Sequence, residues 1–238
     1  MTKKLARGFV IRRPLEAVLG NLRSTPDRSI AIQNYARLAA RYEGTTTRIR
    51  SVRSRTIERL DLQPGDTVFD VGCGAGAILH ELAQAVGDAG QVVGIEQSPE
   101  MAELAQRAAI GAANVHVVVE SVEDFRVAWR ADAVILCYTH DVLQSPAALA
   151  NLFSQVKPGA RVAVSGLCLA PWWGVLGNAW VLWGARHYLT TWRGLQAPWN
   201  NLLAHCPDLC VVARYHARTG YIAIGTHQPL GIDAKVLT

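Results

Sequence analysis

A glycine-rich stretch beside an acidic residue is the first feature of the sequence that could do chemistry. In VFDVGCGAGAIL, residues 68–79, Gly72, Gly74 and Ala77 have the spacing G-x-G-x-x-G/A. This spacing is typical of a strand, tight turn and helix that bind a dinucleotide pyrophosphate. Asp70, however, precedes the first glycine by two residues. At about 5 Å and an effective dielectric of about 20, a carboxylate repels each pyrophosphate charge by a few kcal/mol, whereas it attracts an ammonium or sulfonium group.

Two further places carry side chains that could bind or catalyse. Glu96 closes the apolar run QVVGIE and could accept hydrogen bonds from a ribose diol, which a dinucleotide and an S-adenosyl ligand both carry. The loop CYTHDVLQSP contains Tyr138, His140 and Asp141. If a nucleophile must lose a proton, His140 is a candidate base with Asp141 as its orienting acid; a role as a helix cap is the alternative.

An alternation of apolar runs and helical segments must position these residues. The strand-like runs are 66–71, 91–96, 115–119, 131–138 and 160–166, and the helical segments are 77–86, 99–109 and 146–156. Strands separated by helices predict a parallel sheet with right-handed crossovers. Two more strand-like runs flank 217–220 with no room for a helix, which predicts a hairpin. We predict an α/β fold with a doubly wound, mostly parallel seven-stranded sheet that ends in an antiparallel hairpin.

The domain organisation predicted from these elements has three parts. Residues 1–59 form a basic helical arm or lid, residues 60–238 form the α/β domain, and about 167–207 form an insertion that covers the substrate. The arm carries fourteen Lys or Arg and four Asp or Glu, whereas the rest carries ten and fifteen. The arm is either a set of solvated helix faces or a surface for an anionic partner.

Taken together, these motifs resemble the class I S-adenosylmethionine-dependent methyltransferases of the small-molecule branch. The resemblance covers about residues 35–226 and includes DVGCGAG, GIEQSPEM, ADAVILCY, KPGARVAVSG and the terminal hairpin. It implies a Rossmann-like methyltransferase fold, S-adenosyl-L-methionine (SAM) as cofactor and S-adenosyl-L-homocysteine (SAH) as product. It implies transfer of a methyl group to an oxygen, nitrogen or carbon of a small molecule.

The resemblance also implies roles for individual residues. Asp70 and the glycine loop would hold the methionyl part, and the Cys137 carbonyl would face its amino group. Glu96 would bind the ribose, while Gln97 and Met101 would flank the adenine, although Met101 could equally be a core residue. Many relatives have GDAEDL where this chain has ESVEDF, so Ser121 replaces an acid beside the adenine. The implied cofactor-binding residues are Tyr42, Asp70, Gly72, Cys73, Gly74, Ala75, Gly76, Glu96, Gln97, Met101, Ser121, Val122 and Cys137.

The acceptor is expected to lie under the insertion. Six of the seven tryptophans lie there, at 172, 173, 180, 183, 192 and 199, and each can bury about 150–250 Å². They could form a packed cap, an apolar pocket, or a membrane-facing surface for a lipid or quinone substrate. The residues predicted to bind substrate are Tyr35, Trp172 and Trp173, and the candidate catalytic residues are His140, Asp141 and Tyr138.

Several other partners and functions are less compatible with the sequence. Residues 162–185 carry no charge, but the helix predicted from Pro171 to Ala185 would be about 22 Å long, too short to cross a bilayer. The basic arm lacks aromatic residues for stacking on nucleic-acid bases. Five scattered cysteines indicate reduced thiols in a cytoplasm and no metal site. A nicotinamide-dependent oxidoreductase and a non-catalytic SAM-binding module remain the alternatives, and the sequence does not determine the oligomeric state.

Overall fold

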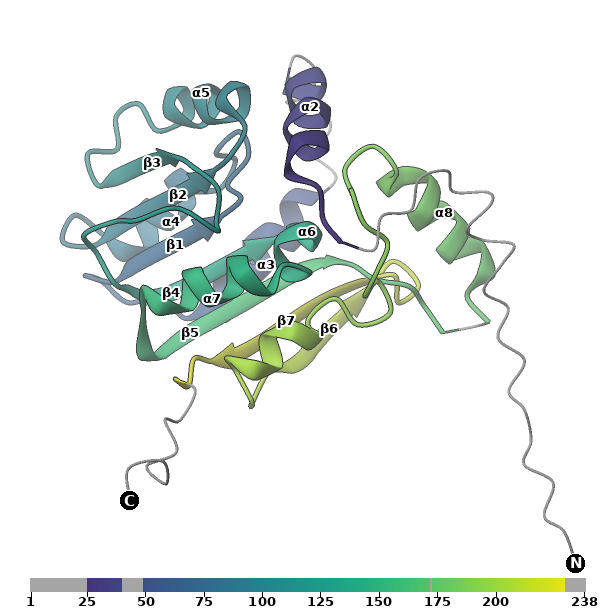
Figure 1. The fold of residues 1–238 in the computed structure, drawn as a ribbon. Helices are drawn as coiled ribbons and strands as arrows, with labels where there is room; N and C mark the ends of the chain where they lie inside the picture. Colours follow the sequence, from purple (N-terminus) through teal and green to yellow (C-terminus); the bar gives the residue numbers. More distant parts are fainter. Residues whose placement is uncertain (1–24, 40–48, 172, 230–238) are drawn as a thin grey trace, which may run out of the picture.

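The computed structural model describes residues 25–39, 49–171 and 173–229, which leaves Tyr42 and Trp172 outside the described residues. The strands of these ranges form one seven-stranded sheet in the order β3-β2-β1-β4-β5-β7-β6 (Figure 1). The strands are β1 (Thr67–Val71), β2 (Gln91–Glu96), β3 (Val115–Val119), β4 (Ala131–Cys137), β5 (Val156–Leu167), β6 (Cys210–Tyr215) and β7 (Gly220–Thr226).

The strand directions confirm the predicted fold class. Strands β1 to β5 run parallel, and β7 pairs antiparallel with both β5 and β6. The observed bounds of β2 and β3 are those predicted. The fifth strand begins at Val156, four residues earlier than expected, because Pro158 and Gly159 form an irregular part of β5 instead of a turn before it.

Alternating side chains place two hydrophobic layers on the two faces of the sheet. Phe69 belongs to the layer that contains Leu149 of α7, whereas its neighbour Val68 belongs to the layer that contains Ile57 and Leu79 of α3 and α4. Figure 1 shows these helices on the sheet. The helices are α2 (Arg28–Ala39), α3 (Arg50–Leu60), α4 (Leu79–Val86), α5 (Pro99–Ala108), α6 (His140–Leu143), α7 (Pro146–Ser154), α8 (Val175–Ala185) and the 3-10 helix η3 (Asn200–Ala204).

The helices α5 and α7 each begin at a Ser-Pro pair. Ser98 and Ser145 each accept a hydrogen bond from the backbone amide three residues later, and a proline follows each cap, as is common at the first helical position. The helix expected from Pro171 begins only at Val175. The Gly174 amide donates to the Pro171 carbonyl in a turn that delays the helix.

The helix α8 lies at one end of the sheet, away from α4 and α7 (Figure 1). Of the helices that the structure describes, none has the length and hydropathy that a membrane crossing requires.

One glycine of the loop is expected to matter for packing. Gly76 has φ +78°, and a Cβ there would lie 2.9 Å from Cα of Ala105 in α5, whereas Gly111 has φ +91° with open space around a Cβ. Alanine at either position costs about 1–2 kcal/mol of backbone strain. Gly76→Ala also overpacks α5, so we expect it to lower the free energy of unfolding by about 1–3 kcal/mol more than Gly111→Ala. Urea unfolding of both variants measures the difference, and equal losses would contradict the close approach.

Candidate functional site

The glycine loop lies at the carboxyl end of β1, between the ends of β2 and β4. Gly72 and Gly74 have φ of +67° and +58°, a conformation that glycine adopts without steric cost. The amides of Gly72 and Cys73 donate to the carbonyl of Ile95 at 2.8 and 3.1 Å. A Cβ on Gly72 would lie 2.7 Å from Cγ2 of Thr139, just after β4. The loop is thus fixed at the switch point of the sheet, where α/β folds bind ligands.

Glu96, the last residue of β2, holds the same loop from the other side. Its Oε2 accepts a hydrogen bond from the Gly74 amide at 3.0 Å, and its Oε1 accepts one from the Ser98 amide at 2.8 Å. Burial raises the pKa of the Glu96 carboxyl, and these hydrogen bonds from backbone amides oppose the rise. A carboxylate offers about four acceptor positions, so Glu96 keeps acceptor capacity for two hydroxyl groups while it holds the loop.

Asp70 lies in β1 just before the loop and is 2 % exposed. Its Oδ2 has no hydrogen-bond partner in the described part of the chain. Burial raises the pKa of Asp70 to about 7; the Arg53 guanidinium lowers it and Glu96 adds to the rise. Because a buried carboxylate is costly unless a positive charge compensates it, this arrangement fits a cationic ligand above the loop.

Arg53 is a site residue that the sequence analysis did not single out. It belongs to α3, is 7 % exposed and lines the same cavity as Gly72 and Glu96. Its charge lowers the pKa of Asp70. The signal that could have identified it is helical spacing, since Arg53, Ile57 and Leu60 all lie on the buried side of α3. An arginine at this place can bind a ligand carboxylate.

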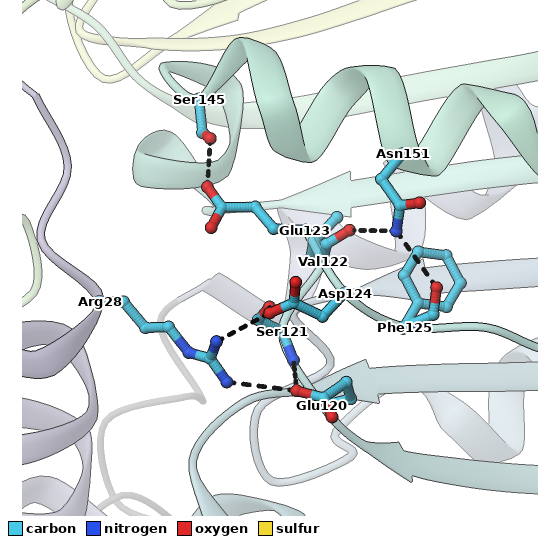
Figure 2. A network of polar contacts seen from close by, with 9 residues as sticks. All are labelled: Arg28, Glu120, Ser121, Val122, Glu123, Asp124, Phe125, Ser145 and Asn151. Atoms are coloured by element: carbon cyan, nitrogen blue, oxygen red, sulfur yellow. Dashed lines mark hydrogen bonds and ion pairs between the residues drawn. The ribbon is translucent and has the colours of Figure 1, made fainter.

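The segment that follows β3 is tied to α2 by an arginine (Figure 2). Nη1 of Arg28 donates to Asp124 at 2.9 Å, and Nη2 donates to Glu120 at 3.2 Å. The Ser121 hydroxyl donates to Asp124 at 2.8 Å. Together these bonds hold α2 across the edge of the cavity beside Ser121. On the other side, Ser145, the cap of α7, donates a hydrogen bond to the Glu123 carboxylate. Asn151 of α7 donates hydrogen bonds to the carbonyls of Val122 and Phe125.

Tyr138 begins the loop after β4 in a left-handed backbone conformation, with φ +60°. Its hydroxyl lies 3.4 Å from that of Tyr215, which donates to the Gly166 carbonyl at 3.1 Å. Burial raises the pKa of Tyr138. The phenol therefore stays protonated near pH 7. Because the Tyr215 proton goes to Gly166, Tyr138 donates to Tyr215 and can accept a hydrogen bond from the cavity that it lines.

The expected pairing of His140 with Asp141 does not form. The Asp141 carboxylate accepts bonds from the Thr190 amide at 3.0 Å and from the Thr190 hydroxyl at 2.7 Å, and that hydroxyl accepts a bond from the Asp27 amide. Asp141 thus fixes the insertion and the start of α2. It does not meet His140, because adjacent residues on a helix point in different directions.

His140 lines the cavity, and both of its ring nitrogens are buried. No described group has hydrogen-bonding geometry toward either nitrogen. Burial lowers the pKa of His140 to about 4, and the backbone of Arg193 and Thr191 opposes that shift. The imidazole is therefore neutral at pH 7.

One cavity of about 640 Å³ brings most of the predicted residues together. It extends from the glycine loop to the cover formed by α8 and the segment after it. Met101 is fully buried in the core, and Trp173 is exposed to solvent outside the cavity. Asp70, Cys73, Ala75 and Gly76 also lie outside its lining. The predicted residues that line it are Tyr35, Gly72, Gly74, Glu96, Gln97, Ser121, Val122, Cys137, Tyr138, His140 and Asp141.

The raised pKa of Asp70 predicts pH-dependent SAM binding. The free protein holds a proton on Asp70 below about pH 7, and a cationic ligand favours the carboxylate, so affinity should fall by up to about tenfold per pH unit below pH 7. Calorimetry in buffers of different ionisation enthalpy should detect proton release on binding.

The variant Asp70→Asn is the control for this pH dependence. We expect weak, pH-independent SAM binding, and an unchanged slope would contradict the assignment. The folded pKa lies above the unfolded one, so Asp70 reduces stability as pH rises from about 4 to 7. Free Asp70→Asn should therefore resist urea better than the wild type at pH 8.

We expect the two ion pairs of Arg28 to slow the release of bound SAH. Both ion pairs are partly exposed, and such pairs contribute about 0.2–1 kcal/mol each. Arg28→Ala should therefore speed SAH dissociation by about two- to tenfold, measured by stopped-flow fluorescence. Arg107→Ala is the matched control, because Arg107 makes an exposed ion pair with Glu103 on α5. Equal rates in the two variants would contradict a role for Arg28 in retention.

Comparisons with known proteins agree with this geometry. Residues 62–179 match the family described as a methyltransferase domain. Nocamycin O-methyltransferase of Saccharothrix syringae is 31% identical over 145 residues, which are 56% of this chain and 49% of that protein. An uncharacterized 37.1 kDa protein in transposon TN4556 of Streptomyces fradiae is 37% identical over 125 residues, 50% of this chain and 35% of that protein. The chain thus spans half or less of these relatives' length.

Solved structures share the fold. The N-methyltransferase NodS of Bradyrhizobium japonicum WM9, in complex with SAH, has a TM-score of 0.61 and 16% identity over 83% of this chain and 98% of that chain. The DhpI–SAH complex has a TM-score of 0.60 and 17% identity over 84% and 97%. With the family match and the glycine loop at the switch point of the sheet, the chain belongs to the class I S-adenosylmethionine-dependent methyltransferases.

Proposed function

We propose that this chain transfers a methyl group from SAM to an oxygen, nitrogen or carbon atom of a small, mainly apolar or aromatic molecule. The observation that carries the proposal is a single cavity, lined on one side by Gly72 and Glu96 and on the other by Val181 and Ala185 of α8. Its volume of about 640 Å³ is in the range of small-molecule sites. Matched relatives include enzymes named for O-methylation of nocamycin and N-methylation of phosphoethanolamine. The proposal therefore does not single out one type of accepting atom.

The cofactor end of the cavity is the charged end. Here the buried acid Asp70 attracts the positively charged methionyl group, and Arg53 binds the carboxylate of that methionyl group. Glu96 accepts hydrogen bonds from the ribose hydroxyls, and Ser121 lies beside the adenine. A nicotinamide dinucleotide is disfavoured at the same place, because Asp70 and Glu96 repel a pyrophosphate.

The acceptor end of the cavity is mainly apolar. SAM supplies a methyl group on a positively charged sulfur, which leaves as a neutral thioether. The residues of the chain therefore need only hold the acceptor in line and keep water away from it. Val181, Ala185 and Leu195 are buried in the cavity wall. The rings of Tyr35 and Tyr188 lie 6.4 Å apart at 56° and suit an aromatic acceptor.

His140 is the proposed proton acceptor for a hydroxyl substrate. Its ring is neutral at pH 7 and lines the cavity, and neither of its buried nitrogens has a hydrogen-bond partner among the described residues. Tyr138 is less suited because its pKa is raised, and Asp141 is less suited because Thr190 binds its carboxylate. A substrate that reacts through an unprotonated amine needs no such base.

The test is methyl transfer from SAM labelled on its methyl group to a panel of phenols, quinols, indoles and secondary amines, with sugars and amino acids as polar controls. We expect transfer to the apolar aromatic acceptors. The variant His140→Ala should lower kcat for phenols by about 10²- to 10⁴-fold and leave transfer to amines and SAH affinity unchanged.

Three outcomes contradict the proposal in different ways. SAH binding without transfer to any acceptor would indicate a binding module. A thermal shift with NADH and none with SAH would reject the cofactor. Unchanged phenol turnover in His140→Ala would reject only the role of His140.

A further inference from the structure

The helix α8 presents a stripe of large apolar side chains to solvent. Leu176, Trp180 and Trp183 are 88 %, 58 % and 69 % exposed, and their i, i+4, i+7 spacing places them on one helix face. Trp173, one turn earlier, is also exposed. A contiguous apolar surface of this kind marks an interaction site in a folded protein.

Two arginines lie beside this stripe, in a part of the sequence that has few acidic residues. Asp208 is the one acidic residue in the sequence between 142 and 232, a range with six Lys or Arg. The Arg186 guanidinium lies 3.7 Å from the ring centre of Trp183. Arg218 is exposed on the β6–β7 turn, which meets α8 where the His216 ring lies 6.5 Å from that of Trp180. Within the described ranges, neither arginine forms an ion pair with a carboxylate.

The same helix forms the rim of the cavity. Trp180 and Gly184 line the cavity and are also exposed to solvent, so the cavity opens beside the apolar stripe. Val181 and Ala185, on the opposite side of α8, are buried in the cavity wall. One helix therefore separates the acceptor end of the cavity from the apolar outer surface.

We propose that the α8 face, formed by Leu176, Trp180, Trp183 and Arg186 with Arg218 beside it, docks on an anionic membrane surface. Indole rings favour the level of the lipid headgroups, and each arginine adds attraction to anionic lipid. A helix of 11 residues is about 16 Å long and lies along the surface instead of crossing it. The excess of Lys and Arg over acidic residues in the sequence between 142 and 232 fits this anionic partner.

The position of the cavity mouth gives this docking a consequence. An apolar acceptor dissolved in the membrane reaches the cavity beside Trp180 without passing through water. This consequence rests on the proposed methyl transfer, whereas the docking itself does not.

The test is co-sedimentation of the full chain with phosphatidylcholine vesicles that contain or lack phosphatidylglycerol. We expect binding only to the anionic vesicles, and weaker binding as salt shortens the Debye length from about 10 Å at 0.1 M to about 3 Å at 1 M. Arg186→Glu with Arg218→Glu should lower the partition coefficient by about tenfold or more, while Arg107→Glu on α5 should change it little. A small effect of the paired reversal, or an equal effect of the control, would overturn the proposal.

The apolar contribution is tested in the same assay. Leu176→Ser with Trp183→Ser should reduce vesicle binding by about tenfold or more, whereas Ile110→Ser, which alters a side chain that is 75 % exposed at the end of α5, should not. SAH titration of each variant confirms that it is folded.

Other outcomes reject the docking proposal without touching methyl transfer. One such outcome is no vesicle binding at any salt concentration while SAH still binds. The other is vesicle binding by the stripe variants equal to that of the wild type. A dimer that Leu176→Ser dissociates would instead make this face an interface between two copies. Vesicle binding without SAH binding would reject the proposed function and leave the docking surface standing.

Discussion

The geometry of the site depends on the carboxylate of Glu96, which accepts hydrogen bonds from the amides of Gly74 and Ser98. These two bonds join the glycine loop after β1 to the start of α5 after β2. Each parallel strand ends at the same edge, so a group that links two adjacent ends sets the position of both loops. Because the carboxylate is buried, each of these hydrogen bonds is stronger than it would be in water. The backbone and the proposed ribose contact are thus positioned by one side chain.

The charges below that loop trade stability for ligand affinity. Asp70 is buried with an oxygen that no described group binds, an arrangement that destabilises the free protein. Arg53 compensates part of this charge from α3. In the proposed complex a cationic ligand completes the compensation, so part of the binding free energy would come from relief of an unfavourable charge arrangement that is already present in the fold.

The sequence predicted the sheet and the position of the glycine loop well because both follow from local patterns. Glycine spacing and apolar runs identified Gly72 and the order of the strands and helices. The partners of single side chains were out of reach, since Thr190 lies far along the chain from Asp141 and meets it only after folding. The tryptophans were ambiguous because composition does not show direction: Trp180 reaches the cavity rim, while Trp183 faces solvent.

Polar contacts of Asn178 and Thr190 help to hold the cover in place. Asn178 binds the backbone of Ala170 in both directions, and Thr190 binds Asp141. None of these contacts involves the glycine loop or Glu96. Residues between these attachment points can therefore be exchanged during evolution with little effect on the cofactor half. If the acceptor binds under the cover as proposed, the fold separates the methyl-transfer step from the choice of acceptor, and new acceptor ranges can arise by drift in one surface segment.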